Sequence, residues 1–449
     1  MSAVTKAIGL AKKLKHRYQD EIRARTPVYL SPVRRIERVS LPQRVCAMTF
    51  DDGPCRLPAN PSSDGKPLTL SLLESLEAFG ARGTFDIVGD TSENYPDKPG
   101  KAGSASWGGI RYDHYPDIHK DADGGAVHCP ELVQRILDGG HEITSHTYRH
   151  VLYGPKPLVY GGRQPFENLA EVTQDLRRLD ELMRRDYGYA IRLSRPPHYV
   201  DSTKDGFTSY DAHALLGYQY LAASFDGAGW LPLASFDAEV DAMLCPMKRA
   251  LEQNPDCLCG QIIFQKDGYN MARRSPVAQA LPKQLALLQQ YGYRVVTVSE
   301  LLSLCPFADL SPESPVFAPA KALLEAGFCI CYRDNTVRPA QILTRGELCM
   351  FAFGWKTAAR RIELVQTKTR VCRDVPCRHP YAAAIELALE RGCMQQRDGR
   401  FFPDEPVSPE DFSGFCRALF AQETRSPQSP ITHAQAIELL AAFAGRETL

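Results

Sequence analysis

The chain has 449 residues, of which 44% are hydrophobic and 24% are charged, and its 53 Lys and Arg balance its 53 Asp and Glu. This length suits two or three domains with at least one large core, and the composition is typical of a soluble globular protein. A net charge of zero gives no reason to expect a nucleic-acid partner, and the absence of a run of about 18 apolar residues predicts no transmembrane segment.

Residues 1–44 are predicted to form a basic segment that contains an amphipathic helix. They hold eleven Lys and Arg but only three acidic residues, and apolar residues recur at helical spacing at Ile8, Ala11, Tyr18 and Ile22. Such a helix packs on the main domain, which is the commoner outcome, or lies on an anionic membrane surface. The segment lacks the apolar core of a secretory signal.

Residues 45–303 alternate short β-rich runs with amphipathic stretches. The predicted strands lie in RVCAMTF, GTFDIVG, GHEITSH, AIRLSRP, YQYLAASFD, GQIIFQKDG and YRVVTVSEL, and predicted helices include 68–81, 130–140 and 168–188. This alternation predicts an α/β domain with a mainly parallel sheet, closed or nearly closed as a barrel. Residues 96–130, rich in Gly, Asp, His and aromatic residues, are predicted to form a long inserted loop.

Residues 304–449 follow a different pattern and are predicted to be a separate helical repeat module. Asp309 and Asp374 occupy matching places in two similar stretches, as do Gly327 and Gly392, each pair 65 residues apart (374 − 309 and 392 − 327). A third, partial copy begins at SPITHAQAIELLAAFAG. Repeats of this kind bury their apolar faces against one another.

The fourteen cysteines show no CxxC pair and no zinc-finger spacing. A secreted chain would be expected to pair them, so their use argues mildly against an oxidising compartment.

Two adjacent carboxylates, Asp51 and Asp52, end the apolar run MTFDDGP. The active site of a parallel barrel lies where its strands end, and two like charges at such a position call for a cation. His146 and His150 in SHTYRH follow another predicted strand end, and at i, i+4 on a helical turn they would face the same way. Two imidazoles and one carboxylate are a ligand set for a divalent metal that leaves positions open for water and substrate.

These motifs resemble the NodB-homology, or polysaccharide deacetylase, family (carbohydrate esterase family 4) over residues 45–303. The resemblance implies a distorted (β/α) barrel in which Asp51 is the catalytic base and Asp52, His146 and His150 hold one divalent metal. We expect zinc, with cobalt, nickel or iron as alternatives that suit the same ligands.

Two further motifs extend the resemblance. SRPPHY matches the arginine motif, so Arg195 is expected to hold the basic aspartate by a charge-assisted hydrogen bond. His198 stands where the family usually has tyrosine. SFDGAGW resembles the fourth motif and makes Trp230 a candidate apolar wall of the substrate groove, although an isolated tryptophan is more often a core residue.

The chain departs from the family at the residues that would supply the general acid, which are called the acid arm below. The family has an aspartate before the tryptophan, which orients a histidine that acts as general acid. Here Gly229 replaces the aspartate, and Lys266 in IIFQKDG replaces the histidine. We expect Lys266 to donate a proton or stabilise the oxyanion, with His198 as the rival acid. The alternative is that Lys266 points to solvent and Gly229 merely relieves packing.

Residues 304–449 resemble S-layer homology domains, which bind anionic cell-wall polysaccharides. LTRGE in the first copy makes Arg345 a candidate anion contact, whereas VSPED and ITHAQ in the later copies lack the arginine. The expected function is metal-dependent removal of N-acetyl groups from a cell-wall glycan. The alternatives are hydrolysis of a different, small or cyclic amide, and a non-catalytic wall-binding protein that keeps the metal. The resemblance implies an extracellular or wall-associated location, whereas the missing signal favours a cytoplasmic one.

Overall fold

The computed structural model describes residues 28–59, 65–91, 123–154, 165–270, 274–422 and 428–443. The predicted N-terminal helix and most of the predicted loop at 96–130 lie outside these residues. All fourteen cysteines are described, and each is a free thiol. No helix among the described residues is both long and apolar enough to cross a membrane.

The centre of the larger domain is one sheet in which every strand pair is parallel, as the alternating pattern predicts. Its order is β1-β6-β5-β4-β3-β2-β8-β7, with β9 also paired to β2, so the described strands form an incomplete, distorted barrel. The strands are β1 (Arg35–Ile36), β2 (Val45–Asp51), β3 (Thr84–Ile87), β4 (Glu142–Ser145), β5 (Leu193–Ser194), β6 (Gln219–Leu221), β7 (Phe225–Asp226), β8 (Ile262–Lys266) and β9 (Arg294–Val296).

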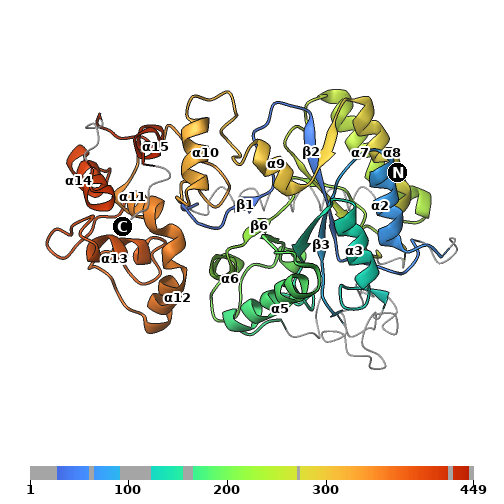
Figure 1. The fold of residues 1–449 in the computed structure, drawn as a ribbon, viewed down its shortest axis with the longest axis horizontal. Coiled ribbons are helices and arrows are strands. Elements are labelled where there is room, and N and C mark those ends of the chain that lie inside the picture. The colour runs from blue at the N-terminus through green and yellow to red at the C-terminus, as the bar shows by residue number, and fades with distance from the viewer. Residues whose placement is uncertain are drawn as a thin grey trace.

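Helices cover the outside of this sheet (Figure 1). The helical elements of this domain are α2 (Leu68–Ala78), α3 (Pro130–Asp138), α5 (Leu169–Tyr187), the short η4 (Pro197–Tyr199), α6 (Ser209–Leu216), α7 (Phe236–Gln253), α8 (Val277–Gln290) and α9 (Val298–Leu304). The three named helix predictions agree with α2, α3 and α5. The run YRVVTVSEL was predicted as one strand, but its second half is α9, because Thr297 caps a helix by accepting the Glu300 N–H.

Alternation along β2 decides which way its last residue points. Cys46, Met48 and Phe50 pack in the apolar layer beneath the helices, whereas Val45 and Ala47 belong to the cluster inside the barrel. Because successive side chains on a strand face opposite sides, Asp51 continues the inner set. The strand therefore delivers a carboxylate to the barrel interior at its carboxyl end.

The C-terminal module consists of helices and lies beside the barrel, with α10 on the side of the module that faces the barrel (Figure 1). Its elements are α10 (Phe317–Glu325), α11 (Arg345–Phe353), η5 (Gly354–Thr357), α12 (Ala358–Thr367), α13 (Ala382–Glu390), α14 (Pro409–Phe420) and α15 (His433–Ala441). They enclose their own apolar core, which includes Phe351, Ile385 and Phe415.

The internal repeat is visible in the hydrogen bonds of its two aspartates. Asp309 accepts the N–H groups of Val337 and Arg338 at 2.7 and 2.8 Å. Asp374 accepts those of Phe401 and Phe402 at 2.8 and 2.7 Å. The same residue type thus closes the same loop in each copy.

The three Thr- or Ser-led motifs are helix caps in the structure. Thr344, Ser408 and Thr432 each accept a backbone N–H at the start of α11, α14 and α15. The side-chain oxygens of Glu347 and Gln435 accept the backbone N–H groups of Thr344 and Thr432 in turn, which completes a capping box. These motifs therefore have a structural function whether or not they bind a ligand.

The proposed boundary at residue 44 needs correction for residues 28–44. These residues are extended rather than helical, and β1 pairs with β6 in the barrel sheet. On the other side, Leu30 packs in the core of the C-terminal module, where its N–H donates to the Tyr381 hydroxyl at 3.2 Å. This segment, residues 28–36, is called the strap below. Sequence pattern missed it because two of its partners lie 185 (220 − 35) and 351 positions later in the chain.

Candidate metal centre

The DDGP turn directs two carboxylates differently. Asp51 is the last residue of β2, and Asp52 follows with a φ of 82°. Gly53 is required at the next position, because a Cβ there would lie 2.1 Å from Oδ2 of Asp267. The positive φ of Asp52 turns its carboxylate away from Asp51 and toward the loop after β4.

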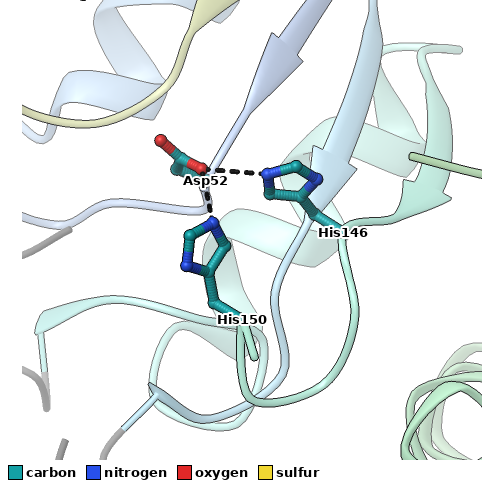
Figure 2. Close-up of side chains that lie close together, drawn as sticks. All are labelled: Asp52, His146 and His150. Carbon is teal, nitrogen blue, oxygen red and sulfur yellow. Dashed lines mark ion pairs between the residues drawn. The ribbon is translucent and has the colours of Figure 1, made fainter. Parts of the chain in front are cut away.

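His146 and His150 converge on Asp52, as predicted (Figure 2). Nε2 of His146 lies 3.3 Å and Nε2 of His150 lies 3.5 Å from Oδ1 of Asp52, and all three side chains are buried. The expected helical turn is wrong, however. The two histidines stand on a loop after β4, where Thr147 and His150 have φ values of 69° and 53°. This folded loop brings the rings together in place of a helix.

Arg195 holds Asp51. Its Nη1 donates to Oδ1 of Asp51 and, at 3.0 Å, lies within hydrogen-bond reach of Oγ1 of Thr49, while Nη2 donates to the Ala222 carbonyl at 3.1 Å. Burial raises the pKa of Asp51 to about 7, although Arg195 opposes the change. A carboxyl with a pKa near neutrality is well matched to exchange a proton at physiological pH.

Sequence reasoning missed two buried carboxylates in this cluster, Asp86 on β3 and Asp267 after β8. Thr69 donates to Asp267, whose pKa burial raises to about 7. Oδ2 of Asp86 lies 3.0 Å from Nδ1 of His146. An aspartate inside the apolar run GTFDIVG was the available signal for Asp86, because a buried charge needs partners.

The charges of the cluster favour the binding of a dication. Four buried carboxylates (Asp51, Asp52, Asp86 and Asp267) lie among only two buried basic side chains, Arg195 and Lys266, so the cluster favours a further positive charge. Burial lowers the pKa of His146, but the carboxylates of Asp51 and Asp86 outweigh it and raise the pKa to about 10. One carboxylate and two imidazoles that meet within 4.8 Å therefore fit a divalent metal in both charge and donor type.

Lys266 reaches the site rather than solvent. It is 2% exposed, and its Nζ lies 2.7 Å from Oδ2 of Asp52, the oxygen that does not face the histidines. A Cβ at Gly229 would lie 2.7 Å from Cγ2 of Val277, so an aspartate at that position would collide with α8. The absence of an orienting carboxylate at 229 is thus a packing requirement, while the position of Lys266 bears directly on the site.

His198 and Trp230 differ in their burial and in their neighbours. His198 on η4 is half-buried, and its ring centroid is 5.7 Å from that of His150, so it stands at the edge of the cluster. Trp230 is 38% exposed after β7, and its indole N–H donates to Asp226 at 3.1 Å. An exposed, tethered indole is available to a ligand, whereas a core tryptophan would not be.

Arg345 is buried in the C-terminal module. Its Nη1 pairs with Asp411, Nε donates to the Phe401 carbonyl at 3.0 Å, and Nη2 donates to the Gln395 carbonyl at 2.7 Å. An anionic glycan would have to displace Asp411 to bind this guanidinium. In the structure Arg345 joins α11 to α14 and to the loop before it.

Fold and site together define an α/β protein with a buried Asp/His metal-binding site at the carboxyl ends of parallel strands. Residues 38–219 match the family model described as polysaccharide deacetylase.

Curated relatives include two peptidoglycan-N-acetylglucosamine deacetylases of Bacillus cereus. One is 24% identical over 157 residues, which are 34% of this chain and 35% of the relative. The other is 25% identical over 262 residues, which are 58% of this chain and 89% of the relative. Among solved structures, a chitin deacetylase from the fungus Colletotrichum lindemuthianum aligns with 20% identity and a TM-score of 0.40, covering 64% of this chain and 96% of that one.

Proposed function

We propose that the protein is a metal-dependent hydrolase that removes N-acetyl groups from an acetylated glycan of the cell wall. The observation that carries the proposal is the meeting of Asp52, His146 and His150 beside an Arg195-held Asp51, in a domain that matches the polysaccharide deacetylase family. The names of the Bacillus cereus relatives support a peptidoglycan-type substrate.

Each residue of the site has a distinct part in the proposed mechanism. Asp52, His146 and His150 would hold the metal, whose chemistry when bound is Lewis acidity that makes water a nucleophile near neutral pH. Asp51 takes a proton from the attacking water, and Arg195 keeps its carboxylate aimed at that water. Trp230 gives the sugar an apolar wall at the mouth of the site.

Lys266 is proposed to complete the acid arm. Its ammonium has three N–H donors and is anchored at 2.7 Å from Asp52 within the cluster. From this position it either donates a proton to the leaving amine or stabilises the negative oxygen that forms when the amide is attacked. His198, which neighbours His150, is the rival donor.

The test is acetate release from a panel of acetylated glycans, measured with and without added zinc, cobalt, nickel or iron. Metal-stimulated release that disappears in Asp51→Asn supports the proposal. Normal metal binding without hydrolysis of any amide would favour the non-catalytic wall-binding protein.

A different amide substrate is the second candidate, and the altered acid arm favours it. Lysine in place of histidine, with glycine before Trp230, changes the chemistry that faces the leaving group. Small and cyclic amides therefore belong in the same panel. Release of product from these, with none from acetylated glycans, would select this candidate.

The C-terminal module is proposed to be a set of S-layer homology-like repeats that anchors the protein to an anionic wall polysaccharide. Its repeated aspartate-closed loops and three capped helices support the repeat organisation. The anchoring proposal implies a wall-associated location. Co-sedimentation of the full chain with purified wall material tests it, and recovery of the protein only in the supernatant would count against it.

A further inference from the structure

Asp86 is a fully buried carboxylate beside the candidate metal centre. It lies between two outward-facing apolar neighbours on β3, Phe85 and Ile87, and its own side chain faces the barrel interior. In the sheet register, Asp86 pairs with Asp51 on one side and Thr144 on the other. Residues in register on neighbouring strands point to the same face, so Asp86 lies beside the predicted base.

The two oxygens of Asp86 have different partners. Oδ1 accepts the Thr144 hydroxyl at 2.6 Å, which fixes the plane of the carboxylate. Oδ2 lies 3.0 Å from Nδ1 of His146. The Nδ1 atom also lies 2.8 Å from the Arg195 carbonyl oxygen, and this contact has hydrogen-bond geometry, whereas the contact with Asp86 is a charge interaction without it.

Two acceptors therefore converge on one ring nitrogen of His146. A carbonyl oxygen and a carboxylate cannot donate, so Nδ1 must carry a hydrogen, and Nε2, on the side of Asp52, is the nitrogen available to exchange its hydrogen for a metal. Metal-binding histidines commonly have an acceptor on the nitrogen that does not bind metal, and loss of that acceptor typically weakens metal binding about 10- to 100-fold.

We propose that Asp86 is a positioning residue for the metal ligand His146. It orients the imidazole, keeps the hydrogen on Nδ1 and presents Nε2 to a divalent metal shared with Asp52 and His150. This inference rests on the metal site of the proposed function but not on the identity of the substrate.

A second metal ion offers the competing explanation. Asp51, Asp86 and His146 also offer ligand atoms within 4.8 Å of one another. Arg195 already pairs with Oδ1 of Asp51, however, and its fixed positive charge disfavours a further cation there. One ion per chain is therefore the expected stoichiometry.

The experiment compares zinc affinity in the wild type, Asp86→Asn and a control, Glu142→Gln, by competition with a chromophoric chelator. Glu142 is a buried carboxylate at the other end of β4, where it accepts hydrogen bonds from the hydroxyls of Thr84 and Ser299. We expect Asp86→Asn to bind zinc at least about 10-fold more weakly, and Glu142→Gln to bind it like the wild type. Asp86→Asn affinity within about twofold of the wild type, or two zinc ions per wild-type chain, would overturn the inference.

Nitrogen-15 NMR of the zinc-loaded wild type gives a reading that needs no stable Asp86 variant. With ¹⁵N-labelled histidine, and His146→Gln to assign the signal, His146 should show a protonated Nδ1 and a zinc-bound Nε2. Zinc on Nδ1 would refute the role of Asp86. A wild type that binds no zinc, cobalt, nickel or iron refutes the proposed function instead, and the positioning role with it.

Discussion

Replacement of Lys266 by methionine tests the acid arm most directly, because methionine keeps much of the length of the side chain but removes the ammonium. The lysine is 2% exposed and pairs at 2.7 Å with Asp52, which is 5% exposed. Any effect of the substitution therefore arises inside the candidate site rather than at the surface.

The structure sets two magnitudes for Lys266→Met. Removal of one partner of a buried ion pair typically costs about 3–5 kcal/mol, so the metal-free variant should unfold at correspondingly lower urea concentration. Loss of a general acid typically slows turnover about 10²- to 10⁴-fold. Loss of a nearby positive charge should also tighten metal binding, because the ammonium repels a dication.

The assay is kcat for acetate release by the metal-saturated protein, together with urea unfolding of the metal-free protein. Lys248→Met is the matched control, because Lys248 is exposed and its pair with Glu252 at 3.9 Å contributes less than about 1 kcal/mol. Lys266→Arg separates proton donation from charge, since arginine keeps the charge but does not release a proton near neutral pH. Wild-type kcat in Lys266→Met, with loss of turnover in His198→Ala, would refute the assignment and make His198 the acid.

Three further outcomes are expected. Asp51→Asn should lower kcat by at least about 100-fold while leaving metal content, measured by elemental analysis, nearly unchanged; loss of metal would mean that the roles of Asp51 and Asp52 are reversed. Burial lowers the pKa of His141 from 6.5 to about 4, so its neutral form stabilises the fold above pH 6.5, and about 3 kcal/mol is lost as the pH falls from 6.5 through 4. His141→Asn should flatten this part of the curve of unfolding free energy against pH, and an unchanged slope would contradict the shift. A chain that ends at Ser303 should keep activity on small soluble substrates and lose wall binding. It should also be less stable, because Leu30 loses its apolar cover. Equal sedimentation of the full and shortened chains with wall material would remove the anchoring proposal.

Local pattern was sufficient for the elements that carry the site. The apolar alternation of β2 and the strand ends before Asp51 and His146 predicted where the cluster lies, because parallel strands share one carboxyl edge. The reason given for the two histidines was wrong, since residues at i, i+4 can also meet through a loop with positive φ. Asp86 was missed because its place beside the cluster depends on the register between β3 and β4. The C-terminal copies were recognisable because Asp309 and Asp374 repeat a local hydrogen-bond pattern.

Long-range pairing was beyond local pattern, and the strap is the clearest case. On one side, the N–H groups of Tyr220 and Ala222 donate to the Arg34 and Ile36 carbonyls; on the other, the Ser31 N–H donates to the Cys331 carbonyl at 3.1 Å. Residues 28–36 therefore add a second, non-covalent link between the barrel and the helical module, made of hydrogen bonds and apolar packing, in addition to the covalent chain at 304. A protease cut near residue 304 would leave the two bodies joined through this strand. For the same reason, transplanting residues 45–303 alone into another protein would remove a strand from the sheet, and a transferable unit should begin at the strap.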